Sequence, residues 1–238
     1  MNDTYLKLIV QGSLYALVLF SIVTWALIAI KGIQHWRVGR QDRAFAGQFW
    51  SAPSLDAAAA LPRDAGPKSR LAATGFDALY VSDADASHDL EHSWDRKELL
   101  ERHLRQQIQR EHASLESGLA VLASVGSTAP FVGLFGTVFG IIHALTAISA
   151  SASASIDVVA GPIGEALIAT GVGIAVAVPA VLAYNFYVRR LKVAALSLDD
   201  YANDLVNLAQ KSAYRVTRPS TQAARPHAGG AQQREAFA

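Results

Sequence analysis

Apolar residues along the 238-residue chain are concentrated in three long blocks. The first block, Leu8–Ile30, reads LIVQGSLYALVLFSIVTWALIAI and contains no charged residue. The second covers about Leu119–Ile148 and the third about Ile156–Val188. Since about 20 apolar residues suffice to cross the hydrocarbon core of a bilayer, each block is long enough to span one. The pattern predicts an all-α membrane protein with three transmembrane helices.

The first block is predicted to be an uncleaved span and not a signal peptide. Its apolar part is too long for a signal peptide, no basic region precedes it, and no small-residue cleavage site follows. Basic residues follow it instead, beginning with Lys31 and Arg37. We therefore expect the first block to remain in the membrane.

The second and third spans are predicted to project beyond the membrane. A helix of about 30 residues reaches about 45 Å, against a hydrocarbon core of about 30 Å. The charged segment Ser87–Gly118 shows an approximate apolar stripe and has no helix breaker before Gly118. It is expected to run into the second span as one very long helix, and the third span is expected to continue through residues 189–216.

The orientation follows from the lysine and arginine residues. Twelve lie between Lys31 and Arg110 and eight lie from Arg189 onward, whereas only Lys7 precedes the first span. The short turn between the second and third spans, SASASASI, has none. Because basic residues gather on the cytoplasmic side, the N-terminus and the turn are expected outside and the long loop and tail inside.

The predicted organisation follows from these spans and their orientation. Its segments are a periplasmic N-terminus (1–7), the first span (8–30), a partly helical cytoplasmic loop (31–118), the second span (119–148), a periplasmic turn (149–155), the third span (156–188), a cytoplasmic helical extension (189–216) and a disordered tail (217–238). Within the loop, Gly47–Arg70 mixes Ala with Pro, Gly and Ser, which indicates a short helix and a linker.

Composition excludes several classes of function. Only 17% of the residues are charged and the net charge is +1, so no basic face indicates a nucleic-acid partner. The chain has no cysteine, which excludes disulfides and thiolate metal sites. No histidine pair at metal spacing and no catalytic set is found. We expect a protein that is not an enzyme and that has no cofactor or metal.

Small residues recur on one face of the second and third spans, and such faces let helices approach closely in lipid. These candidate packing residues are Gly133, Gly136 and Gly140 in the second span and Gly161, Ala169, Gly173 and Ala177 in the third. Pro130 and Pro179 are expected to bend the two helices, because proline removes an internal hydrogen bond.

One acidic residue, Glu165 in GPIGEALIAT, lies deep inside a span and falls on this small-residue face. A charged acid at mid-bilayer costs at least about 2.5 kcal/mol, so Glu165 is expected inside a bundle and sensitive to protonation. Thr137 and Thr170 are candidate pore-lining groups beside it, and His143 is a weaker one. The alternative for Glu165 is a neutral carboxyl that only joins helices through a hydrogen bond.

Two segments carry a resemblance to a known family. APFVGLFGTVFGIIHALTAI (Ala129–Ile148) and GPIGEALIATGVGIAVAVPAVLAYNFYVRR (Gly161–Arg190) resemble the two signature helices of the ExbB/TolQ family almost position for position. SIVTWALIAIK (Ser21–Lys31) is similar to the first span of that family. The resemblance covers about half of the chain and little of the loop 31–118. The flagellar stator branch of the wider family has four spans, which the three blocks disfavour.

The resemblance implies an inner-membrane homopentamer whose second and third helices line a central pore. The single membrane helices of an ExbD-like partner would occupy this pore. The complex would use the proton motive force and act through a TonB-like partner on the import of siderophores and vitamin B12. Glu165 matches the membrane glutamate of the family, and Thr137 and Thr170 match its pore threonines. Whether Glu165 carries the proton or shapes the path for one held by the partner stays open.

Three hypotheses of function remain. VTWA, FVGLFGTV and the segment ending YNFYVRR are similar to the ExbB branch, which favours a subunit of the TonB system. FAGQFW and IIHAL are similar to the TolQ branch, which maintains the cell envelope in the Tol-Pal system. The hypothesis of another class is a non-conducting membrane scaffold.

Overall fold

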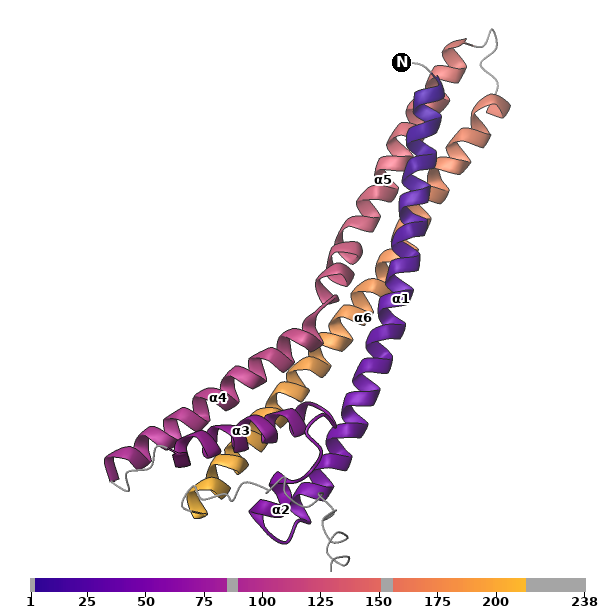
Figure 1. Cartoon of the computed structure of the whole chain (residues 1–238). Coiled ribbons are helices and arrows are strands. Elements are labelled where there is room, and N and C mark those ends of the chain that lie inside the picture. Colours follow the sequence, from indigo (N-terminus) through magenta and orange to yellow (C-terminus); the bar gives the residue numbers. More distant parts are fainter. Residues whose placement is uncertain (1–2, 85–89, 151–155, 213–238) are drawn as a thin grey trace, which may run out of the picture.

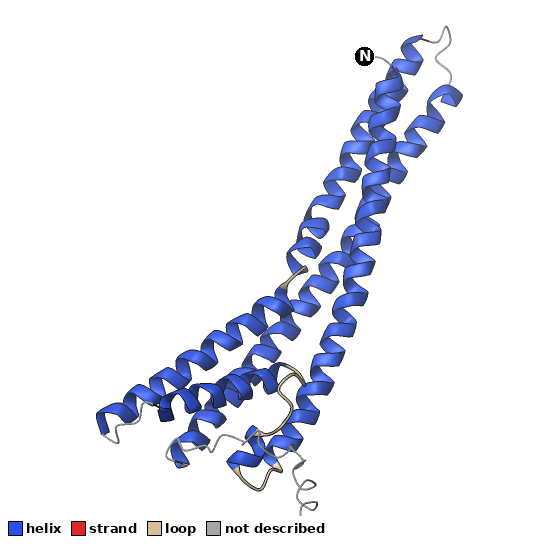
Figure 2. Cartoon of the chain, viewed as in Figure 1, coloured by secondary structure: helices blue, strands red, loops and turns tan. Residues whose placement is uncertain are grey.

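The computed structural model of the chain describes residues 3–84, 90–150 and 156–212. The only regular secondary structure in these ranges is helical, and short loops join the helices (Figure 2). The helices are α1 (Asp3–Trp50), α2 (Leu55–Ala59), α3 (Pro67–Ala84), α4 (Leu90–Glu116), α5 (Leu119–Ala150) and α6 (Ile156–Lys211). Three helices are long and apolar enough to cross a membrane, and the apolar windows lie in α1, α5 and α6. The expected all-α fold with three candidate spans is therefore confirmed for the described residues.

The long helices form a bundle at one end of the molecule and splay apart at the other (Figure 1). α1 and α6 run in the same direction and α5 runs against them (Figure 1). At the splayed end, α2, α3 and α4 lie around the last turns of α1 and α6 (Figure 1). The molecule thus consists of a three-helix bundle and a helical base.

A continuous core holds the three-helix bundle together. It is formed by buried apolar side chains from all three long helices and the end of α4: Leu17, Leu115, Leu119, Leu122, Val125, Ala129, Val176, Ala177, Ala180, Tyr187 and Leu191. The hydroxyl of Tyr187 also donates a hydrogen bond of 2.7 Å to the carbonyl oxygen of Ile28, which ties α6 to α1.

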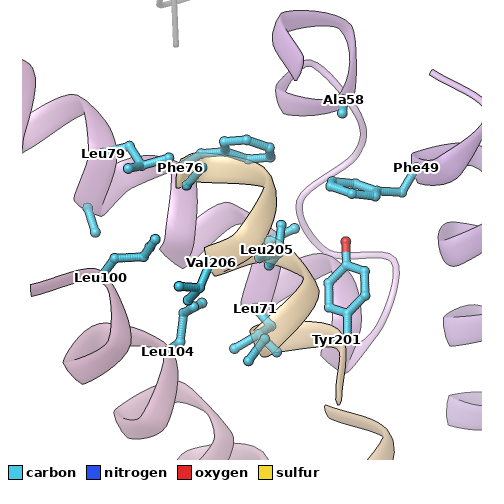
Figure 3. Packing of buried hydrophobic residues seen from close by; sticks show 14 of the residues in the cluster. Phe49, Ala58, Leu71, Phe76, Leu79, Leu100, Leu104, Tyr201, Leu205 and Val206 are labelled. Atoms are coloured by element: carbon cyan, nitrogen blue, oxygen red, sulfur yellow. The ribbon is translucent and has the colours of Figure 1, made fainter. Parts of the chain in front are cut away.

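A second core, the base cluster, lies where α1, α2, α3, α4 and α6 meet (Figure 3). Tyr201 of α6 packs edge-on against Phe49 of α1, with ring centroids 5.4 Å apart. Phe76 of α3 and Leu100 of α4 close the cluster from the other side (Figure 3). Because this core is apolar and enclosed, the loop 31–118 folds as part of the protein and is not a loose connection.

The helix α3 was not predicted from the sequence, and polar contacts with α1 and α4 position it. The Asp42 carboxylate accepts a hydrogen bond of 3.0 Å from the Lys68 backbone N–H in the first turn of α3. The guanidinium of Arg70 donates to both oxygens of Glu111 on α4, at 2.7 and 2.6 Å. Glu111 is only 5% exposed, so this ion pair joins α3 to α4 within the base.

The expected continuous helix from the loop into the second span is wrong at one point. α4 ends at Glu116 and α5 begins at Leu119, and the chain changes direction between them (Figure 1). Gly118 has a φ of 80°, a left-handed conformation that glycine adopts without steric cost. The ammonium of Lys31 donates a hydrogen bond of 2.9 Å to the Leu115 carbonyl oxygen in the last turn of α4. Glycine and a capping cation together end the helix.

Candidate functional site

Two glycines let the backbones of α5 and α6 touch. A Cβ added at Gly133 would lie 2.6 Å from the carbonyl oxygen of Ala169, and one at Gly173 would lie 2.7 Å from that of Ala129. Both distances are far below van der Waals contact, and backbone atoms cannot move aside as flexible side chains can. Only glycine fits at these two positions with the helices as they lie.

The same contact extends along α5. A Cβ at Gly140 would lie 2.5 Å from the Ala166 Cβ, and one at Gly136 would lie 2.5 Å from the Ser13 Oγ of α1. A further glycine, Gly126, packs against Val181 in the same way. Sequence reasoning missed it, although its seven-residue spacing from Gly133 and Gly140 places the three on one helix face.

The remaining candidate packing residues divide between two environments. Ala169 and Ala177 are buried in the bundle. A Cβ at Gly161 would meet no atom of the described residues within 4 Å, so a side chain would fit there. Pro130 and Pro179 lie inside helices that continue past them.

Thr137 of α5 and Thr170 of α6 face each other across the helix contact. Their hydroxyl oxygens lie 2.7 Å apart. The Thr137 hydroxyl also lies within hydrogen-bond distance of the carbonyl oxygens of Gly133, at 3.1 Å, and Leu134, at 2.9 Å. Thr137 is 7% exposed. The two threonines therefore form a polar pair in an otherwise apolar interface.

Glu165 lies on the exposed side of α6 and not in the interior of the bundle. The expectation of an interior carboxylate is therefore wrong for the single chain. No hydrogen bond or ion pair joins Glu165 to any residue whose side chain the structure describes. The small-residue face drifts around the helix by about 40° every four residues, so its outer end leaves the contact that its centre makes.

Glu165 and Thr170 lie on opposite edges of the buried stripe of α6. They are five residues apart, which separates their directions by about 140° around a helix. Ala166 and Ala169, between them, are buried against α5. The structure thus brings Thr137 and Thr170 together and leaves Glu165 on a separate face.

His143 is partly buried near the end of α5, and its Nδ1 has no hydrogen-bond partner among the described residues. No group of three or more His, Cys, Asp or Glu residues in the described part of the chain could hold a metal ion. The polar groups at this end of the bundle include the hydroxyls of Thr137 and Thr170, the imidazole of His143 and the carboxylate of Glu165.

Sequence reasoning missed a buried polar stripe on α1. Ser13, Thr24 and Lys31 are all buried, and Lys31 is only 3% exposed. Ser13 lies against Gly136 of α5, and Lys31 reaches the end of α4. The Thr24 Oγ1 has no partner among the described residues. The seven-residue step from Thr24 to Lys31 was the available signal, since two helical turns return to the same face.

Comparison with known proteins places the chain in a family. Residues 66–200, more than half of the chain, match the model of the MotA/TolQ/ExbB proton channel family. A biopolymer transport protein ExbB from Neisseria meningitidis is 40% identical over 196 residues, covering 82% of this chain and 89% of the relative. One from Xanthomonas campestris pv. campestris is 39% identical over 203 residues, covering 81% and 78%. A Tol-Pal system protein TolQ from Haemophilus influenzae is 31% identical over 219 residues, covering 89% and 94%.

These relatives and the three apolar helices agree on the location of the protein. The chain is a multi-pass protein of the bacterial inner membrane. The family match includes α3, α4, α5 and the part of α6 that carries Glu165 and Thr170. The chain belongs to the MotA/TolQ/ExbB proton channel family.

Proposed function

We propose that the chain is the ExbB-like subunit of a TonB–ExbB–ExbD complex. In this role it uses the proton motive force to energise TonB-dependent import of siderophores and vitamin B12 across the outer membrane. Relatives named ExbB at 39–40% identity support this branch of the family, against 31% for the relative named TolQ.

The observation that carries the proposal is the exposure of Glu165 on α6. A carboxylate that faced lipid near mid-bilayer would cost at least about 2.5 kcal/mol. Other protein or water must therefore cover this face of α6. A homopentamer that turns α5 and α6 toward a central pore would supply both, and the membrane helices of an ExbD-like partner would lie in that pore.

An open glycine one turn from Glu165 supports a close partner at the same face. Gly161 has no atom of the described residues within 4 Å of a Cβ position, so the backbone of α6 is accessible there. Small residues at such a surface allow another helix to approach closely in lipid, where the hydrophobic effect does not drive association.

The proposed orientation places the N-terminus in the periplasm and the helical base in the cytoplasm. Each proton that crosses 100 mV releases about 2.3 kcal/mol, so several protons are needed for a substantial mechanical step. Glu165, with Thr137 and Thr170, lines the proposed path, and His143 has a secondary role. Glu165 either holds the proton or polarises the site of a proton on the partner.

Energised uptake by cells tests the proposal. Cells that carry Glu165→Gln as their only copy should lose TonB-dependent uptake of vitamin B12, while the complex still assembles. Glu101→Gln is the matched control, because Glu101 is a carboxylate of α4 that pairs with Arg105 outside the spans. Normal uptake in the Glu165→Gln cells would contradict an essential role for this carboxyl.

The alternative function is a TolQ-like subunit of the Tol-Pal system, and the relative from Haemophilus influenzae, which covers 89% of the chain, favours it. Cells that lack the chain would then leak periplasmic proteins and become sensitive to detergent, with vitamin B12 uptake unchanged. Loss of uptake with an intact envelope would support the ExbB-like role.

A further inference from the structure

The outer face of α1 is apolar from Tyr15 to Ile33. Its exposed side chains fall on one side of the helix, within about 140° of arc at 100° per residue: Tyr15, Val18, Leu19, Ile22, Trp25, Ile30 and Ile33. Lys31 does not interrupt this face, because its side chain turns inward to the Leu115 carbonyl oxygen. An exposed apolar face of this length on a membrane-spanning helix is suited to lipid chains.

The same face becomes cationic within one turn after Ile33. Trp36 is 63% exposed, and Arg37 and Arg40 are exposed beside it. The guanidinium of Arg40 lies 5.8 Å from the centre of the Trp36 ring, within the range of a cation–π contact. Tryptophan is enriched where the hydrocarbon core meets the head groups, so Trp36 marks that level on α1.

The two arginines have no acidic partner among the described residues. The ion pairs at this end of the molecule join other groups, such as Arg63 with Asp77 and Arg70 with Glu111. Gly39 lies next to Arg40 and presents no side chain, and a Cβ there would meet only an Arg43 nitrogen at 3.9 Å. The guanidinium groups are thus free and accessible at the head-group level.

We propose that Trp36, Arg37 and Arg40 form a binding site for the head group of an anionic phospholipid. The guanidinium groups of Arg37 and Arg40 hold the phosphodiester, since planar guanidinium matches phosphate geometry. The Trp36 ring holds Arg40 at the level of the glycerol backbone. The acyl chains lie along Ile30 and Ile33, directly above the arginines on the same face. Continuity of the apolar face with the two cations favours a lipid over a soluble anion or a protein.

Fluorescence quenching by brominated phospholipids tests this site in the full-length protein. The chain has four tryptophans, and Trp36 is isolated by replacing Trp25, Trp50 and Trp94 with phenylalanine. Brominated phosphatidylglycerol and brominated phosphatidylcholine with identical chains are compared in vesicles at equal mole fraction. We expect phosphatidylglycerol to quench Trp36 more strongly. A version that keeps only Trp25, on the same helix face but far from the arginines, should show no preference.

A double variant tests whether the two arginines cause the preference for phosphatidylglycerol. It combines Arg37→Gln and Arg40→Gln in the protein that keeps only Trp36. The relative affinity for phosphatidylglycerol should fall about fivefold for each arginine removed, since one basic residue near an anionic surface contributes about 1 kcal/mol. The control is Arg105→Gln, on the exposed side of α4, which should leave the relative affinity for phosphatidylglycerol unchanged.

Three outcomes would overturn the proposal. The first is equal quenching of Trp36 by both lipids, and the second is a preference that survives in the double variant. The third is quenching by neither lipid, which would mean that a protein covers this face. Circular dichroism of each variant shows whether the helices are retained, so that a loss of preference is not mistaken for unfolding.

Discussion

The hydroxyl oxygens of Thr137 and Thr170 lie 2.7 Å apart across the contact between α5 and α6. Each hydroxyl has a single proton to donate. When Thr137 donates to the carbonyl oxygen of Leu134, at 2.9 Å, its oxygen accepts the proton of Thr170. The pair therefore has a direction, from Thr170 to Thr137 to the backbone of α5. If the Thr137 hydroxyl rotates to donate to Thr170 instead, its bond to the Leu134 carbonyl oxygen is lost.

Thr137→Val is expected to lower proton flux through the complex, because valine keeps the shape of threonine but cannot pass or hold a proton. Loss of one hydrogen bond between membrane helices costs about 0.6–2 kcal/mol, so the variant should still fold and assemble. Flux into vesicles containing the purified complex measures the effect. Thr137→Ser, which keeps the hydroxyl, should conduct nearly as the wild type does. Equal flux in the valine and serine variants would show that the hydroxyl is not used.

Gly133→Ala is expected to destabilise the bundle by about 1–3 kcal/mol, the usual cost of inserting a methylene into a packed interior. Its Cβ would lie 2.6 Å from the Ala169 carbonyl oxygen, which cannot move without separating α5 from α6. The melting temperature of the purified protein measures this cost. Gly12→Ala is the matched control, because Gly12 also lies in a spanning helix and a Cβ there meets no atom within 4 Å. A bundle that melts at the same temperature in both variants would contradict the tight contact.

The sequence was sufficient to predict the spans, because apolar length alone decides which helices cross a membrane. It was not sufficient for the break between α4 and α5, where the left-handed Gly118 acts together with Lys31 from α1, which reaches the Leu115 carbonyl oxygen. Likewise α3 depends on Asp42 and on Glu111, which are distant in sequence. Such contacts join residues that are far apart in the sequence, so a local sequence pattern does not predict them.

The site was only partly predictable for a similar reason. Thr137 and Thr170 meet because their helices are antiparallel neighbours, which spacing within one helix cannot reveal. Glu165 shares a four-residue spacing with Ala169, yet it lies at the edge of the contact, and the 3.6-residue helical repeat turns it outward. The pattern singles out the residue, and an interior position for Glu165 in an assembly stays a prediction.

Asp42 should make the stability of the helical base depend on pH. Burial raises the pKa of its carboxyl above the ordinary value. The folded state therefore binds the proton more tightly than the unfolded state does, and stability falls as the pH rises from about 4 through the raised pKa. Asp42→Asn keeps an oxygen acceptor for the Lys68 N–H and removes this ionisation. We expect the variant to lose less stability than the wild type over that pH range.

Thermal melting of both proteins between pH 4 and pH 7 measures the difference. Asp42→Ala is a useful third protein, because it removes the acceptor itself. Relative to Asp42→Asn it should cost about 1 kcal/mol at every pH, as loss of a helix cap does, since neither variant ionises at this position. If the melting temperatures of wild type and Asp42→Asn change equally with pH across the range, Asp42 ionises as freely in the folded protein as in the unfolded chain. That result would contradict the prediction.

The most direct test of the central claim is proton flux through the complex purified with its ExbD-like partner and reconstituted in vesicles under an imposed potential. Glu165 is exposed in the single chain, and the proposed oligomer turns it toward the proton path. We predict that Glu165→Gln abolishes flux while the oligomer keeps its mass and its partner, and that Glu101→Gln conducts normally. Flux through the Glu165→Gln complex equal to that of the wild type would contradict a role for Glu165 in proton transfer.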